Sequence, residues 1–409
     1  MDLNILVRGQ SNAILMMEAD GWAGAGTLVR EVQRLLGFDG VTDKVNLVYG
    51  RSDWDSGTAF GGTALVGDWL RARNGDWRQG WQVAGREQAL LDEVGRLPAA
   101  QHDDPTAVLW LHSESDSARA DLTPEEWMSA VRFDAAQLRA AFGQDAAALP
   151  YMFISAMPYW GTDQGHQAIR QGMERLAADP AFNARIAARM QDTDLTTDDQ
   201  DGNGGTVEYG GGHIDGGDAV QTASRAARAL AEAFAAYAKP GSPVALAGGD
   251  IADQGPQVIR AAPAGANRLR LDVAHDQATG FQALDPDAAA GLGWSVHGGT
   301  ATVRGVAAAI EDADTLLVTF DGPVPADGLL FYGHGHGRLA GAGGEGRGNA
   351  VYDTTDLPIW VGAEGLAIGA EATPGGGPDG GAPDGASGDD GTFIEGFAVP
   401  VAPADLVFA

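Results

Sequence analysis

DLNILVRGQSNA, residues 2–13, begins with a short apolar run that stops at a polar turn. Apolar residues bounded by a glycine predict a buried strand over Leu3 to Val7 that ends at Gly9. Open α/β sheets bind ligands beyond the carboxyl ends of their strands. Ser11 is therefore a candidate nucleophile at the mouth of a site. The alternative is a serine turn that only caps the next helix.

Composition limits the class of protein. A chain of 409 residues that is 44% hydrophobic can bury a substantial core and favours two domains. The net charge of −30 argues against nucleic acid as a partner, because a phosphate backbone would be repelled. The absence of cysteine excludes disulfides, thiolate metal sites and cysteine nucleophiles.

The sequence carries no signal for a membrane. No stretch is long and apolar enough to predict a membrane span. The start lacks the basic residues and apolar stretch of a signal peptide. We therefore expect a chain that is cytoplasmic, or secreted after removal of a leader, or part of a phage-like particle.

The first half, residues 1–240, alternates short apolar runs with helical patterns. This alternation predicts an α/β domain whose parallel sheet is covered on both faces. Pro240-Gly241 ends its last, alanine-rich helix. The predicted strands are 3–7, 45–49, 107–111 and 151–155, and the predicted helices are 28–36, 127–142, 168–176 and 219–239.

The second half, residues 241–409, changes character. Short β-rich runs separated by Gly, Pro and Asp turns predict a domain that resembles a β-sandwich. Residues 370–391 contain almost no large apolar side chain, which predicts a long loop of low intrinsic order. The predicted strands are 258–260, 269–273, 301–304, 315–320 and 329–332.

Three further segments carry groups suited to catalysis. Glu114 and Asp116 follow the strand at 107–111, so they also fall at a carboxyl strand end. His213 lies on a glycine-rich loop before a helix, where it either projects into a cleft or is simply exposed. The glycine-rich stretch 53–63 can bring a backbone N–H close to an oxyanion.

The order of these elements resembles the SGNH hydrolases, closest to the sialate O-acetylesterases and acetylxylan esterases. The resemblance rests on Gly9-Gln-Ser-Asn12, on Trp110 followed by Glu114-Ser-Asp116, and on His213 before a helix. Residues 329–333 and 348–360 extend it into the second half. It implies an SGNH, flavodoxin-like, three-layer α/β/α fold. It also implies a serine carboxylic-ester hydrolase that removes acetyl groups from sugars or a cell-surface polysaccharide.

The same resemblance implies the role of each site residue. Ser11 would attack the acetyl carbonyl and His213 would act as general base. The oxyanion would lie among backbone N–H groups, including that of Gly61 or Gly62, and a donor around His112. Glu114 would support the site, and no cofactor is required. The residues expected to bind substrate are Gln10, Asn12 and Trp54.

Two departures from the family pattern keep a second function open. Gly210 and Gly211 stand where the family has an Asp that orients the catalytic His, so Glu208, Asp215 or a backbone carbonyl would have to replace it. His112 stands where the family has Gln. The alternative is a glycan-binding spike or adhesin of a phage-like particle with little or no catalysis. A small-substrate esterase or lipase is disfavoured, because no broad apolar groove is evident around Ser11.

Other segments have less specific signals. Asp199, Asp201 and Asn203 match the first half of a calcium loop, although an acidic surface loop is the favoured interpretation. His334 and His336 are interpreted as sugar contacts or exposed residues rather than metal ligands. Some tryptophans in polar surroundings are candidates for stacking on sugars, and these are Trp54, Trp77 and Trp81.

Overall fold

The computed structural model describes residues 1–50, 57–155, 161–193, 213–299, 301–339 and 349–372. Its first half contains a five-stranded parallel sheet among these residues, as the sequence predicts. The strand order is β2-β1-β5-β6-β7, which within this sheet is the flavodoxin-like order 2-1-3-4-5. The strands are β1 (Asp2–Gly9), β2 (Lys44–Val48), β5 (Thr106–Leu111), β6 (Tyr151–Ile154) and β7 (Ala184–Ala188).

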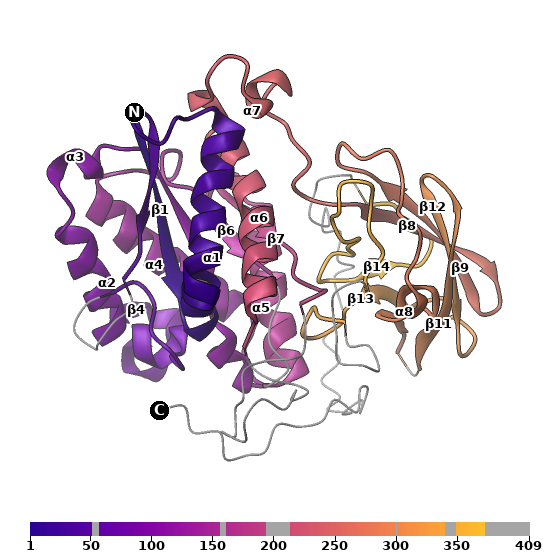
Figure 1. The fold of residues 1–409 in the computed structure, drawn as a ribbon. Coiled ribbons are helices and arrows are strands. Elements are labelled where there is room, and N and C mark those ends of the chain that lie inside the picture. The colour runs from indigo at the N-terminus through magenta and orange to yellow at the C-terminus, as the bar shows by residue number, and fades with distance from the viewer. Residues whose placement is uncertain (51–56, 156–160, 194–212, 300, 340–348, 373–409) are drawn as a thin grey trace, which may run out of the picture.

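Helices cover both faces of this sheet, which gives three layers (Figure 1). Alternate side chains of β1 explain the two cores: Leu3 and Ile5 enter one core, and Leu6 enters the other. The helices α1 (Ser11–Leu36) and α6 (Gly216–Ala233) pack on the first face. The second face carries α2 (Gly85–Gly95), α4 (Pro124–Phe142) and α5 (Asp163–Ala177).

Short elements connect these layers. The turn η4 (Glu114–Ala118) follows β5 directly, and η1 (Leu65–Trp69) leads into the hairpin of β3 (Leu70–Ala72) and β4 (Trp81–Val83). Val244 and Ile251 still pack against the first core, beyond the boundary predicted at residue 240. The remaining short elements are η2 (Arg73–Gly75), η3 (Trp77–Gln79), α3 (Ala99–His102), η5 (Ala235–Tyr237) and α7 (Pro243–Leu246).

The second half is a β domain, as predicted, but its described strands form one seven-stranded antiparallel sheet rather than two packed sheets. The end strands of this sheet, β8 and β14, contact each other, so the sheet curls towards closure. Turn spacing predicts where strands lie and not how many sheets they form. The order is β14 (Leu366–Ala367), β13 (Leu329–Tyr332), β10 (Trp294–His297), β11 (Thr302–Asp312), β12 (Thr315–Phe320), β9 (Arg268–Ala274) and β8 (Gln257–Gly265), with α8 (Pro286–Ala289) beside it.

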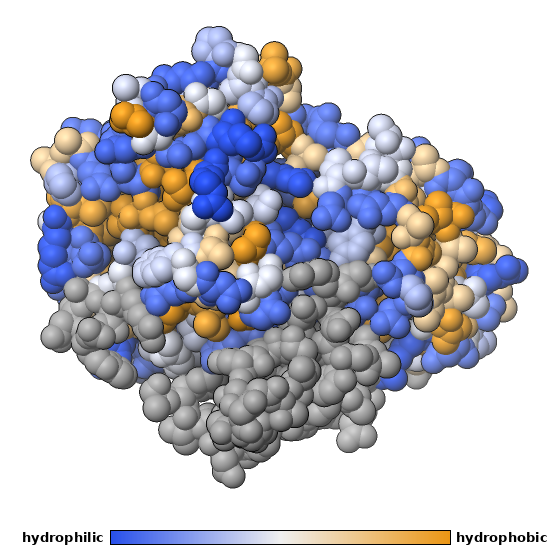
Figure 2. All heavy atoms as spheres, in the orientation of Figure 1, coloured by the Kyte–Doolittle hydropathy of each residue, from blue (hydrophilic) through white to orange (hydrophobic). Residues whose placement is uncertain are grey.

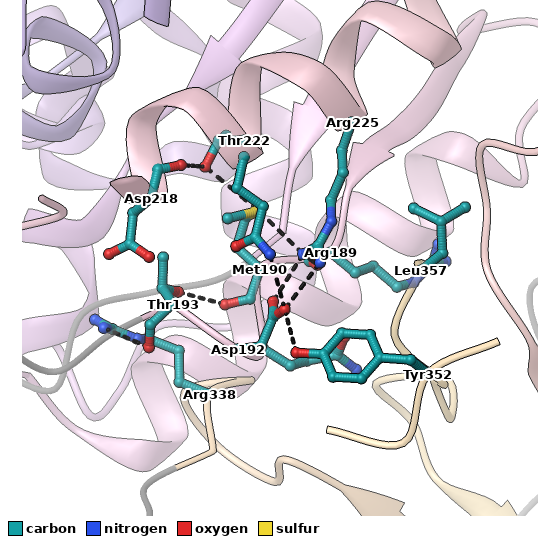
Figure 3. A network of polar contacts seen from close by, with 12 residues as sticks. Arg189, Met190, Asp192, Thr193, Asp218, Thr222, Arg225, Arg338, Tyr352 and Leu357 are labelled. Atoms are coloured by element: carbon teal, nitrogen blue, oxygen red, sulfur yellow. Dashed lines mark hydrogen bonds and ion pairs between the residues drawn. The ribbon is translucent and has the colours of Figure 1, made fainter. Parts of the chain in front are cut away.

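A buried ion pair of the first half lies near the end of β7 and is joined to the second half by a tyrosine hydroxyl (Figure 3). Asp192 accepts hydrogen bonds from Arg225 of α6 at 2.7 and 2.8 Å, and from the Tyr352 hydroxyl at 2.6 Å. Arg225 lowers the pKa of Asp192, although burial acts in the opposite direction. The contact fixes the segment around Tyr352 against α6 and the residues that follow β7.

The molecular surface is mixed in character. On the face drawn in Figure 2, hydrophilic and hydrophobic side chains are interspersed over both halves. Over the part of the chain that the structure describes, no helix combines the length and apolarity needed to cross a membrane.

Candidate active site

Gly9 brings the ends of β1 and β5 together with the segment 58–60. Its N–H donates to the Thr58 carbonyl at 3.2 Å, and its own carbonyl accepts from Phe60 at 3.1 Å. A Cβ built on Gly9 would lie 1.9 Å from the carbonyl oxygen of Leu111, so this approach requires glycine. Ser11 is thereby held at the carboxyl edge of the sheet, where its partly buried side chain begins α1.

The start of α1 is suited to stabilising negative charge. The first N–H groups of a helix have no carbonyl in a preceding turn to bond, and the helix dipole places positive charge there. Ser11 is the first residue of α1, and the Gln10 carbonyl accepts the N–H groups of Ala13 and Ile14. The Ser11 N–H is therefore a candidate oxyanion donor.

Asn12 ties three segments of the candidate site to one another. Its Nδ2 donates to Glu114 Oε1 at 2.9 Å, and its Oδ1 accepts the Ile214 N–H at 3.1 Å. Ile214 is the neighbour of His213, and Glu114 follows β5. The side chain next to Ser11 thus joins the ends of β1 and β5 to the segment that carries His213.

Two buried carboxyl groups organise the turn after β5. Burial raises the pKa of Glu114 to about 7, and its Oε2 makes no hydrogen bond to the described residues. Burial likewise raises the pKa of Asp116 to about 6. Asp116 accepts the N–H groups of Leu65 and Val66 at 2.7 and 2.9 Å, which anchors η1 to this turn. Both carboxyl groups therefore hold loops in place.

Gln10 and His112 are buried and bond to the protein, although Gln10 Nε2 makes no hydrogen bond to the described residues. Gln10 is buried, and its Oε1 accepts the Ser115 N–H at 3.1 Å. His112 is 1% exposed, with Nε2 3.0 Å from the Thr63 carbonyl and Nδ1 3.5 Å from Arg8 Nη2. Burial, and then Arg8, lower the pKa of His112 well below its usual value, so the ring is neutral. Its N–H donates to Thr63, which leaves no hydrogen for the expected oxyanion role.

Arg8 is a buried cation that the sequence did not single out. Its guanidinium lies between the rings of Trp69 and Trp110, 4.3 and 4.1 Å from their centroids. It forms an ion pair with Asp134, which also accepts the Tyr151 hydroxyl at 2.8 Å. An arginine directly after an apolar run is unusual, and this feature of the sequence could have indicated a buried cation. Arg8 also packs against His112, with its Nη2 3.5 Å from the Nδ1 of the histidine.

Gly61 and Gly62 form an exposed turn next to the Gly9 strand end. Phe60, which bonds to Gly9, precedes them directly. Gly62 has φ +65°, a left-handed conformation that favours glycine. A Cβ built on Gly61 would meet no atom within 4 Å, so the space beside it is open. Their role as oxyanion donors remains a prediction that this location permits.

His213 is partly buried just before α6. Asp215 caps this helix, with its Oδ1 accepting the Asp218 N–H at 2.7 Å, so that oxygen is already used. Gly210 and Gly211 lie outside the described residues, as do Trp54, Glu208, Asp199, Asp201 and Asn203. Among residues with described positions, no group of three or more His, Cys, Asp or Glu is arranged to hold a metal ion.

An aromatic pair made of an exposed tryptophan and a partly buried tyrosine lies at the same edge of the sheet, and the sequence did not predict it. Trp22 is 53% exposed, and its ring meets that of Tyr49 edge-on at 5.9 Å. Tyr49 follows β2, and its hydroxyl donates to Glu18 Oε1 at 2.5 Å. The helix α1 breaks here, since Asp20, Gly21 and Trp22 all have left-handed φ values of 50–72°. Such strain in a bulky residue is uncommon and often accompanies function.

The other tryptophans and histidines considered from sequence have mainly internal contacts. Trp81 is 2% exposed and donates to Ser129, whereas Trp77 is partly buried under Arg78. His334 stacks on His297 at 4.2 Å, and burial lowers its pKa to about 3. His336 lies 3.1 Å from Asp163 of α5. The two histidines therefore lie in or beside the contact between the halves.

Comparisons with known proteins identify no family. No protein-family model matches the chain, and no curated protein matches it. A solved structure of a "putative arylesterase" from Agrobacterium tumefaciens str. C58 is 13% identical, with a TM-score of 0.30, and the match covers 56% of this chain and 96% of that one. The N-terminal part of the bacterial S-layer protein SbsC is 12% identical, with a TM-score of 0.18 over 35% of this chain. The match spans only 33% of that S-layer fragment. Values this low establish neither a common fold nor a common activity.

Proposed function

We propose that the protein is a serine-dependent ester hydrolase in which Ser11 is the nucleophile and His213 the general base. The observation that carries this proposal is the pair of hydrogen bonds made by Asn12. They connect the residue next to Ser11 to Glu114 on one side and to the neighbour of His213 on the other. Residues far apart in the sequence are thereby gathered at one edge of the sheet, where such sheets bind ligands.

The proposed reaction passes through an acyl-enzyme. Ser11 Oγ attacks the ester carbonyl carbon while His213 takes the hydroxyl proton. The N–H groups of Ser11 and of Gly61 or Gly62 bond to the resulting oxyanion. The tetrahedral intermediate expels the alcohol, which receives the proton from His213. Water then attacks the acyl group with His213 again as base, and this releases the acid and restores Ser11.

We propose an acetylated carbohydrate as the substrate. The exposed Trp22 ring and Tyr49 lie at the same sheet edge as Ser11, since β2 and β1 are neighbours with Val48 opposite Leu6. Amphipathic aromatic rings provide a large contact surface with a polar tip, which suits a sugar ring bearing both C–H and O–H groups. The aromatic pair would bind the sugar while its ester reaches Ser11.

The central test is acetate release from p-nitrophenyl acetate and from an acetylated polysaccharide. Ser11→Ala removes the nucleophile, so we expect the turnover rate to fall by about a thousandfold or more. The matched control is Ser224→Ala, a serine of α6 outside the candidate site. Release that survives Ser11→Ala would contradict the mechanism. Polysaccharide binding without any release would favour the glycan-binding alternative.

The substrate class has a separate test. Trp22→Ala removes the aromatic surface but leaves Ser11, so we expect KM for an acetylated oligosaccharide to rise by about tenfold, the loss of one stacked ring. Hydrolysis of p-nitrophenyl acetate, which has no sugar, should stay close to wild type. Equal effects on both substrates, or no effect on either, would argue against a sugar subsite at Trp22.

A further inference from the structure

A cavity lies away from the candidate active site. It has a volume of about 490 Å³ and is bordered by the amino half of β7 and the carboxyl ends of α5 and α6. The candidate active site lies instead at the carboxyl ends of the strands. Both halves of the chain line the cavity, because Trp360 and Asp276 contribute to its wall. Its volume is in the range typical of small-ligand sites.

The lining of this cavity is strongly acidic. Five carboxyl groups face two guanidinium groups, those of Arg185 and Arg189. Arg185 already forms an ion pair with Glu232. Arg189 lies 3.7 Å above the centre of the Trp360 ring and donates to Gln254. The five carboxyl groups are Glu174, Glu232, Asp250, Asp253 and Asp276.

Four of the five carboxyl groups have close partners. Glu174 accepts the Ala363 N–H at 2.6 Å, and Asp250 accepts from Gln277 at 2.8 Å. Asp276 accepts two backbone N–H groups, each at 2.8 Å. Glu232 has Arg185. These contacts account for four of the five carboxyl groups, and the fifth is Asp253.

Asp253 has a hydrogen bond from Gln254, but among the described residues one of its two oxygens is left without a donor. Its side chain is 4% exposed, and its Oδ2 makes no hydrogen bond to any residue with a described position. The nearest cation is Arg185, at 3.9 Å, and that cation is paired with Glu232. Burial, with Glu232 and Asp276 adding to it, raises the pKa of Asp253 to about 7. A buried carboxylate oxygen without a hydrogen bond is costly, so a donor supplied from outside would be bound favourably at Oδ2.

The carboxyl groups that line the cavity favour an organic cation as the ligand. Within the described ranges no cluster of His, Cys, Asp or Glu has the arrangement of a metal site. An ammonium group provides three N–H donors and one positive charge on a compact centre. It can bond to Asp253 while the other carboxyl groups stabilise its charge or a second one. Such a ligand does not depend on the proposed esterase function.

We propose that this cavity binds a small organic ammonium ligand, such as an aliphatic diamine or an amino sugar, through Asp253. The test is isothermal titration calorimetry with putrescine, and in a second arm with D-glucosamine, at about 150 mM salt to screen the surface charge. We expect one saturable site per chain for at least one probe. The probe that binds shows whether the cavity prefers an aliphatic diamine or an amino sugar. Absence of binding for both probes would overturn the proposal.

Two controls separate a site from general attraction to an acidic protein. Asp253→Asn should weaken binding by at least about tenfold, since one charged hydrogen bond is lost. The exposed Asp103→Asn removes the same charge elsewhere and should leave the affinity unchanged. Equal affinity of Asp253→Asn and wild type would overturn the proposal. In the unmodified protein, the affinity for putrescine, whose aliphatic ammonium groups stay protonated over this range, should rise from about pH 6 to about pH 8 as Asp253 ionises, and a flat profile would contradict the proposal.

Discussion

At the scale of single residues, Asn12 determines the geometry of the candidate active site. It donates to Glu114 and accepts from Ile214, and both contacts are within ordinary hydrogen-bond distance. Glu114 in turn is buried with a pKa of about 7, so the amide of Asn12 also stabilises its ionised form. From these contacts we expect Asn12 to position Ser11 and His213, where the sequence predicted a substrate contact.

Replacing Asn12 should change turnover more than substrate binding. In Asn12→Ala the segment with Ile214 loses its contact to the Ser11 turn, so we expect kcat to fall by about ten- to a hundredfold. KM should change by less than about threefold, because no substrate contact is removed. Steady-state kinetics on p-nitrophenyl acetate measures both values, with the exposed Asn74→Ala as control. An unchanged kcat would show that Asn12 has no such role.

At the scale of elements, the buried pair of Asp192 and Arg225 joins the segment after β7 to the middle of α6 (Figure 3). Asp192 follows β7, Arg225 belongs to α6, and Tyr352 comes from the second half of the chain. The side chains of Asp192 and Arg225 are almost completely buried. Because α6 begins just after His213, this ion pair also helps fix the helix behind the candidate base.

Breaking this pair should strongly destabilise the fold. Arg225→Met leaves Asp192 buried without its cation, and we expect the free energy of unfolding to drop by about 3–5 kcal/mol. The exposed pair of Arg260 and Asp272 is the control, where Arg260→Met should cost less than about 1 kcal/mol. Urea unfolding measures both. Combining Arg225→Met with Asp192→Asn should recover part of the lost free energy of unfolding, because the uncompensated charge is removed. If Arg225→Met alone cost no more than Arg260→Met, the buried ion pair would not have this stabilising role.

At the scale of the whole molecule, several buried carboxyl groups make stability depend on pH. Burial raises the pKa of Glu87, Glu114 and Asp253 to about 7, and that of Asp116 to about 6. A carboxyl group with a raised pKa in the folded state holds its proton more tightly there than in the unfolded chain. Its contribution to the stability of the folded state is therefore present below the ordinary pKa near 4, and it is lost as the pH rises to about 7.

The molecule should therefore be more stable at about pH 5 than at about pH 8. Glu87 is fully buried, and neither of its carboxyl oxygens bonds to a residue in the described ranges. Glu87→Gln should reduce the difference in Tm between the two pH values, because one ionisable group is removed. Thermal unfolding followed by circular dichroism gives Tm, with the exposed Asp92→Asn on the same helix as control. An equal pH dependence in both variants would contradict this assignment.

The parallel sheet was predictable because its main strands are apolar runs that end in glycine or polar turns, as at Gly9 and Glu114. The strand β7 was not predicted, because Ala184–Ala188 is rich in alanine and contains an arginine. Contacts between side chains that are far apart in the sequence could not be predicted either. Nothing local to Arg8 or His112 indicates that they meet or that both are buried, and burial, followed by Arg8, lowers the pKa of His112 so that its ring is neutral.

The proposed nucleophile can be tested most directly by covalent labelling. A fluorophosphonate that reacts with activated serines is incubated with the full chain, and the modified peptide is identified by mass spectrometry. The account predicts a single adduct on Ser11 that is strongly reduced in His213→Ala, since the serine is activated by a neighbouring base. An adduct on another residue, or no adduct on the wild-type protein, would contradict it.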